Sequence, residues 1–286
     1  MNEGTTQKLI YVAVALISLV IGISIANIPK ETAKEESTSI FSVHDDAAPA
    51  CNVAVVRLQG GLWTYSDSSY DPSDPNGYSS SGGVDSEQLV SDIEDASASS
   101  SIDAIVLQID STGGSPVGAE EVAHALKRAD KPTVALIRGE GLSAAYWSAT
   151  GAGLIVAAEN AEVGSIGVTS SYVDQAQRNK KDGYTFHSIS TGVYKDMLNS
   201  NKDLTKNEEQ LIRDEISVIL GNFVRTVSDN RNLSTTSVME LATGAPFTSP
   251  FALEHGLIDK IGDKETVRGY LSELLKKPKQ EIIYCR

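Results

Sequence analysis

The hydrophobic and polar positions divide the chain into an apolar start, a polar stretch and a long patterned region. Leu9–Ile28 is a run of 20 residues without a charge, long enough to cross the hydrocarbon core of a bilayer as a helix. Because a cleaved signal peptide normally has a shorter apolar region, we expect residues 1–28 to be an N-terminal transmembrane helix. Cleavage after Ala26 is the alternative. Residues 29–50 are polar and charged, and they predict a linker before a domain at 51–286.

Within 51–286, short apolar runs alternate with segments that have hydrophobic residues at helical spacing. This alternation predicts an α/β fold in which parallel strands are joined through helices. The expected strands are 51–58, 102–109, 133–137 and 154–157, and 186–190 has a strand-like alternation. The expected helices are 85–95, 117–129, 142–150, 206–230, 238–243, 250–255 and 265–276.

One segment of the domain interrupts this alternation. Residues 66–84 are dense in Ser, Gly, Asp and Pro and contain little apolar surface to bury. They predict a flexible loop, which either faces the substrate or is an insertion without a function.

Composition excludes some classes of partner. The formal net charge of −14 leaves no basic surface for the phosphates of a nucleic acid. The chain has two cysteines, Cys51 and Cys285, without the spacing of a metal site, so we expect no metal and no cofactor. The two can pair if the domain lies outside the cytoplasm, but their number alone leaves the pairing open.

The candidate chemistry centres on Ser143 and Lys195. Ser143 lies among small residues in the stretch GLSAAYW, and Lys195 follows 52 positions later in TGVYKDM. A lysine can take the proton of a serine at neutral pH when burial lowers its pKa. Each residue alone has an ordinary alternative, since such a serine can cap a helix and most lysines are solvated. Together they suggest a serine peptidase with a lysine base.

A glycine pair, Gly113–Gly114, follows the strand predicted at 102–109. Its backbone N–H groups can hold an oxyanion, although a plain turn with positive φ explains the glycines equally well. A histidine-based hydrolase is a minor alternative, because the chain has no G-x-S-x-G motif.

Five segments, in this order, resemble the signal peptide peptidase A family of membrane-anchored serine proteases. They are IVLQIDSTGGSPVGAEEVAHALKR, KPTVALIRGEGLSAAYWSATGA, AEVGSIGVTSS, TGVYKDMLNS and FTSPFALEHGLIDKIGD. The resemblance implies a Clp protease/crotonase-like fold of repeated β-β-α units. It also implies a ring of identical subunits in which the serine and the lysine come from neighbours. The implied substrates are signal-peptide remnants and other small apolar-rich peptides, and the implied location of the catalytic domain is extracytoplasmic.

The same resemblance assigns roles to single residues. It implies Ser143 as the nucleophile and Lys195 as the general base. Gly114 and the Ser143 backbone N–H would form the oxyanion hole, and Ser165 in GSIGV would orient the lysine amine.

The sequence departs from the family pattern at two places. Leu142, Ala144 and Ala145 stand where the family has smaller residues around the serine, and Asp110 stands where the family has asparagine. A catalytically impaired homologue that acts as a peptide-binding or regulatory membrane scaffold is therefore the second hypothesis. A crotonase-type acyl-coenzyme A enzyme is the third, although the apolar N-terminus and the Ser/Lys spacing argue against it.

Overall fold

The computed structural model describes residues 51–65 and 83–285. The predicted anchor at 1–28, the linker at 29–50 and residues 66–82 of the predicted loop lie outside these residues. Residue Val84, at the end of that loop, belongs to a short strand. None of the helices in the described part is long and apolar enough to cross a membrane.

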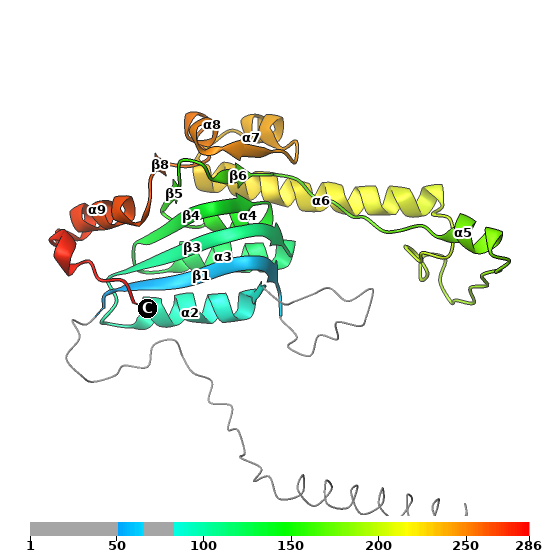
Figure 1. Cartoon of the computed structure of the whole chain (residues 1–286), viewed down its shortest axis with the longest axis horizontal. Coiled ribbons are helices and arrows are strands. Elements are labelled where there is room, and N and C mark those ends of the chain that lie inside the picture. Colours follow the sequence, from blue (N-terminus) through cyan, green and yellow to red (C-terminus); the bar gives the residue numbers. More distant parts are fainter. Residues whose placement is uncertain (1–50, 66–82, 286) are drawn as a thin grey trace, which may run out of the picture. The chain divides into compact units, whose positions relative to one another are not determined.

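The core of the domain is an eight-stranded sheet, in which all pairings but one are parallel (Figure 1). The main path runs β2-β1-β3-β4-β5-β8, and β6 pairs with β4 and, in the antiparallel direction, with β7. The strands are β1 (Val53–Trp63), β2 (Val84–Asp85), β3 (Ala104–Gly114), β4 (Thr133–Leu142), β5 (Leu154–Ala157), β6 (Glu162–Gly164), β7 (Pro246–Thr248) and β8 (Lys260–Ile261).

Helices connect these strands as the alternating pattern predicts. They are α2 (Ser86–Ala98), α3 (Pro116–Arg128), α4 (Ala144–Ala149), α5 (Ala176–Lys181), α6 (Lys206–Arg231), α7 (Thr235–Leu241), α8 (Ser249–Glu254) and α9 (Lys264–Leu275), with a short 3₁₀ turn at Lys279–Glu281. The prediction of an α/β fold is confirmed, and the architecture is consistent with the Clp protease/crotonase-like arrangement.

Alternation along the strands gives the sheet two different faces. Residues Ile105, Leu107 and Ile109 of β3 are fully buried, and α2, α3 and α4 lie along this face (Figure 1). On the other face, the neighbours Ala104 and Val106 pack with Val267 and Leu271 of α9 in one apolar cluster. Since α9 covers only the amino-terminal half of its face, the carboxyl-terminal halves of the strands carry exposed polar residues there: Arg57, Gln59, Asp110, Thr112 and Arg138.

This half-open sheet explains why three strands are longer than predicted. β1, β3 and β4 each continue about five residues past the apolar run that marked them, and β3 includes the glycine pair that we expected in a turn. A continuous apolar run, the signal used to predict these strands, marks a strand only where both of its faces are buried. The predicted helix at 142–150 was therefore placed too early, because Leu142 still pairs with Gly164 in the sheet.

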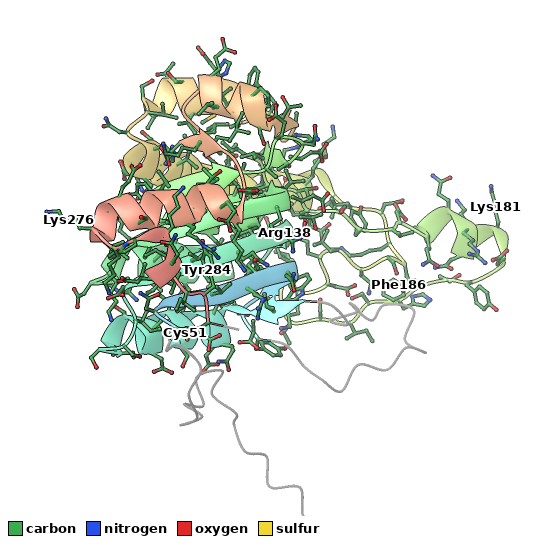
Figure 2. The ribbon with its side chains drawn as sticks, turned by 60° about the vertical axis from the view of Figure 1, so that its left-hand side comes forward. Cys51, Arg138, Lys181, Phe186, Lys276 and Tyr284 are labelled. Atoms are coloured by element: carbon green, nitrogen blue, oxygen red, sulfur yellow. A yellow bond between two sulfur atoms is a disulfide. The ribbon has the colours of Figure 1, made fainter. Side chains whose placement is uncertain are left out.

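The two cysteines form a disulfide that closes the domain. Cys51 precedes β1 and Cys285 ends the described chain, 234 positions later. Around the bond, the C-terminal segment lies along β1, with Cys285 N–H donating to the Val53 carbonyl at 2.8 Å. Figure 2 shows Cys51 and Tyr284 at this edge of the domain. The pairing that the sequence left open is present in the structure.

Between β6 and α6 the chain leaves the sheet and forms an extension, residues 169–205. It runs out beside α6 to α5 and returns to the start of α6 (Figure 1). Figure 2 shows its labelled residues Lys181 and Phe186 well away from Arg138 of the sheet. Residues 186–190, which alternate like a strand, form no strand here. Since the extension packs against little of its own domain, apolar side chains such as Ile189 and Val193 remain exposed.

Candidate active site

Ser143 occupies the sharp turn between β4 and α4. Its φ of 51° and ψ of −122° lie in a backbone region that residues other than glycine rarely adopt. Such strain persists only where the surrounding structure holds it. The turn places the serine directly after a parallel strand and before a helix, as in a nucleophile elbow. The sequence does not match G-x-S-x-G at this elbow, because Ala145 stands in place of the second glycine.

The glycine pair lies directly beside this serine. Gly113 and Gly114 have φ of 115° and 151°. A Cβ on Gly113 would lie 2.8 Å from Ser143 Cβ, and a Cβ on Gly114 would lie 2.0 Å from the Leu62 carbonyl oxygen. Both positions therefore require glycine for close approach as well as for the backbone angle.

The register of β1 and β3 fixes the direction of the Gly114 N–H. Leu62 pairs with Gly114, and Ser115 N–H donates to the Leu62 carbonyl at 2.7 Å. Because successive N–H groups of a strand point to opposite sides, the Gly114 N–H points away from β1 and toward the side of β4. Ser143 lies on that side.

The Ser143 N–H, by contrast, is already engaged. It donates to the Gly164 carbonyl at 2.7 Å, which fastens the turn to β6. The next amide, that of Ala144, begins α4, and the first N–H groups of a helix have no partner within it. In this state the Ser143 N–H is unavailable as an oxyanion donor, and the Ala144 N–H is the donor next to it.

Ser165 lies on the neighbouring turn, after β6. It also has a positive φ, 49°, and its hydroxyl donates to the Gly244 carbonyl at 2.8 Å. Because the Ser165 hydroxyl donates its proton to the Gly244 carbonyl, Ser165 Oγ still has lone pairs that can accept a hydrogen bond from an amine.

These residues meet in one cleft of about 530 Å³. Its lining includes Gly114, Ser143 and Ser165, so the structure brings together three of the predicted site residues. The opposite wall is apolar and comes from α6, with Ile219, Leu220 and Phe223. Phe223 stacks on Trp147 of α4 at a centroid distance of 4.6 Å, which joins the helix of the serine to this wall.

Helix α4 is held firmly under the cleft. All six of its residues are buried, and the Tyr146 hydroxyl donates to the Leu257 carbonyl at 2.8 Å. Burial raises the pKa of Tyr146, so the phenol stays neutral and acts as an anchor. Of the three residues that depart from the family pattern here, only Ala144 lines the cleft, since Leu142 and Ala145 point into the fold.

Lys195 is not among the residues that line the cleft. It lies on the extension, with an exposed side chain, in a turn closed by its N–H and the Gly192 carbonyl at 3.1 Å. A single protomer therefore presents the serine and the lysine at separate places.

Asp110 has a structural role on the open face of the sheet. Between Ile109 and Ser111 of β3, β4 advances four residues and forms a bulge. Asp110 Oδ1 accepts a hydrogen bond from the Glu140 N–H in this bulge at 3.2 Å, and a Cβ on Gly139 would lie only 2.7 Å from this oxygen. The carboxylate thus shapes the strand that leads to Ser143.

We expect Asp110→Asn to leave the rate of peptide hydrolysis within about threefold of wild type, because an amide oxygen can accept the same hydrogen bond. Asp110→Ala loses this bond and should lower the free energy of unfolding by about 1 kcal/mol in urea titrations. A tenfold or greater acceleration by Asp110→Asn would instead mean, at about 1.4 kcal/mol per tenfold, that the charge opposes the reaction.

Comparison with known proteins identifies the family of the chain. Residues 125–277 match Peptidase family S49. The chain belongs to this family. The matched region includes Ser143, Ser165 and Lys195, and the resemblance to the signal peptide peptidase A family is confirmed.

Three relatives from different organisms carry protease names. The chain is 34% identical over 173 residues, 60% of its length, to a Synechocystis protein named "Putative protease". It is 30% identical over 250 residues, 85% of its length, to Protease 4 of Salmonella typhi. It is 28% identical over 179 residues, 62% of its length, to the chloroplastic serine protease SPPA of Arabidopsis thaliana. The chain covers 62%, 38% and 26% of these relatives, less than two thirds of each.

Proposed function

We propose that this family S49 member is a serine endopeptidase in which Ser143 is the nucleophile and Lys195 is the general base. The observation that carries the proposal is the strained turn at Ser143, which opens on the same cleft as Gly114 and Ser165. Strained turns of this kind cluster at functional sites.

The reaction follows from these groups. Ser143 Oγ attacks the scissile carbonyl carbon while the Lys195 amine takes the hydroxyl proton. The carbonyl oxygen becomes an oxyanion that accepts from the Gly114 N–H and, since the Ser143 N–H is engaged by Gly164, from the Ala144 N–H. The protonated amine then gives its proton to the leaving nitrogen. Water repeats the sequence on the acyl-enzyme and releases Ser143.

The lysine that serves each cleft belongs to a neighbouring copy of the chain in this proposal. Lys195 lies outside the cleft of its own protomer, and the extension that carries it exposes Val193 and Ile189. Large exposed apolar side chains on a projecting segment are typical of a surface that another chain covers. In a ring, the amine would leave water as it enters the next cleft, which favours its neutral form.

The apolar wall of α6 supports substrates rich in apolar side chains. Ile219, Leu220 and Phe223 can bury such side chains, while the polar groups at the turn hold the peptide backbone. Signal-peptide remnants, small and apolar, fit this description. The substrate preference is part of the proposal.

We also propose that residues 9–28 anchor the protein in a membrane with the catalytic domain outside the cytoplasm. The Cys51–Cys285 disulfide supports this side of the membrane, since disulfides persist in oxidising compartments. In cells expressing the full chain, the protein should stay with the membrane pellet after carbonate extraction. Its catalytic domain should be digested by a protease added to the outside of the cytoplasmic membrane. Recovery of the protein in the carbonate supernatant would refute the anchor. Protection of the catalytic domain from the protease until the cells are lysed would refute the orientation.

A covalent probe tests the proposal directly. A peptidyl phosphonate should label the full-length protein once per active site, and mass spectrometry should locate the adduct on Ser143. A Ser165→Ala variant keeps the nucleophile and should still be labelled at the same residue, more slowly. Absence of labelling together with intact peptide binding would favour the scaffold hypothesis.

A further inference from the structure

The extension presents its lysine from a loop that has little secondary structure of its own. Residues 191–201 form no helix or strand, and Lys195 is exposed. Catalytic groups need placement within about 0.5 Å, which usually requires a supporting layer of fixed side chains. The loop must therefore be held by contacts other than a helix or a strand.

Asp196, the residue after the lysine, begins a chain of hydrogen bonds. Its Oδ1 accepts from Asn199 Nδ2 at 2.9 Å. Asn199 Oδ1 in turn accepts from the Asn201 side chain at 3.0 Å and from the Asn201 N–H at 2.9 Å. Asn201 Oδ1 then accepts from Asn179 Nδ2 of α5 at 2.9 Å. Four side chains thus connect the lysine loop to α5.

The carboxylate itself is held in its charged form. Asp196 is half-buried, and its Oδ2 is shielded from solvent and accepts no hydrogen bond from the described residues. The hydrogen bond from Asn199 and, to a smaller extent, the nearby Ser188 side chain hold the pKa of Asp196 below its ordinary value. An ionised acceptor makes stronger hydrogen bonds than a neutral one, which strengthens the first link of the chain.

Backbone strain lies inside the span that this chain closes. Leu198, between Asp196 and Asn199, has a φ of 64°, a left-handed conformation that is unfavourable for a residue with a side chain. Such a conformation persists only where neighbouring contacts fix it. The Asp196–Asn199 hydrogen bond spans this residue and supplies such a contact.

The same loop continues into the first turn of α6. Glu208 is buried and pairs with Lys202 at 2.5 Å, and it completes a capping box with Thr205. The Lys202 hydrogen bond, followed by the Thr205 N–H, lowers the pKa of Glu208 to about 2. Since α6 runs on to Ile219 and Phe223 in the cleft wall, the lysine loop is attached to a rigid element of the domain.

We propose that Asp196 is a positioning residue for catalysis: through Asn199 and Asn201 it holds the loop in the one shape that presents the Lys195 amine to a cleft. This inference rests on the proposed function, because it takes Lys195 as the base. Asp196 touches no reacting atom in this account. It acts on the rate through the lysine.

Steady-state kinetics of the full-length assembled protein test this role. Asp196→Ala should lower kcat by about 10- to 100-fold, because a displacement of about 1 Å costs this much. The KM should stay within about threefold, since the cleft is intact. Asn199→Ala should act similarly, and the double variant should be no worse than the lower single one. Asp196→Asn keeps an oxygen acceptor and should retain a kcat within about threefold of wild type.

Asp182→Ala is the matched control, because Asp182 lies on the same extension and pairs only with Arg178, at 3.8 Å, among the ion pairs of the described residues. Its kcat should equal that of wild type. Hydrogen exchange of the amides in 192–201 should accelerate in Asp196→Ala and not in the control, while the oligomer keeps its size. A fully active Asp196→Ala variant with loosened amides would overturn the positioning role and leave the peptidase intact. An inactive, unlabelled wild type would overturn both.

Discussion

Replacing Ser143 with alanine should lower the rate of peptide hydrolysis by roughly 10⁴-fold or more, since its hydroxyl is the group that accepts the acyl chain in the proposed mechanism. Alanine fits the small space beside Gly113 without a new contact. The melting temperature and the size of the oligomer should therefore not change. Hydrolysis of a fluorogenic peptide by the purified full-length protein is the measurement.

Ser148→Ala is the matched control for this variant. Ser148 lies on the same helix, and its hydroxyl donates to the Ala144 carbonyl at 3.0 Å inside the fold. It is not among the residues that line the cleft. Its loss should cost about 1 kcal/mol of stability and leave turnover in place. Equal activity of Ser143→Ala and wild type would refute the peptidase mechanism.

Replacing Lys195 with alanine should reduce turnover to the level of the Ser143 variant, whereas Lys181→Ala on the same extension should not affect it. The stronger test combines the two inactive variants. If the serine and the lysine of a site come from neighbouring protomers, an assembly of Ser143→Ala and Lys195→Ala chains contains some complete sites. A head-to-tail interface pairs one surface of each chain with a different surface of the next. With random mixing in equal amounts, half of the chains keep Ser143 and half of their neighbours keep Lys195. About a quarter of the sites are then complete, so about a quarter of wild-type activity should return.

The outcome distinguishes the two arrangements of the dyad. Sites built within one protomer would stay inactive in every mixture, because each chain lacks one of the two groups. Activity that returns only after the variants are dissociated and reassembled together would exclude contamination by wild-type protein. No recovery after verified co-assembly would contradict the shared site.

The sequence predicted the fold where burial leaves a clear hydrophobic pattern. The interior helices and the first halves of β1, β3 and β4 were predicted because α9 and α2 to α4 cover both faces of the sheet there. Their second halves were missed, since one face is open there and carries Gln59, Asp110 and Arg138. The bulge at Gly139 and Glu140 depends on a contact with Asp110, which no local pattern encodes.

The candidate site was predicted to a different extent. Small residues and glycines around Ser143 and Gly114 indicate that backbone segments approach each other closely, and this signal is visible in the sequence. The structure places these two residues in one cleft. The engagement of the Ser143 N–H by Gly164 depends on the β4–β6 register and could not be predicted. The apolar wall from α6 was also missed, because Ile219 and Phe223 repeat at helical spacing like any core residues.

The position of the lysine relative to the serine is the central claim, and its measurement is the distance between Ser143 Oγ and Lys195 Nζ in the assembled full-length protein. A cryo-EM or crystal structure of the oligomer would provide this distance within and between protomers. The account predicts one pair of neighbours at about 3 to 4 Å, allowing for the looser contacts of a site without substrate. Amines that remain in solvent, far from every serine in the particle, would contradict it.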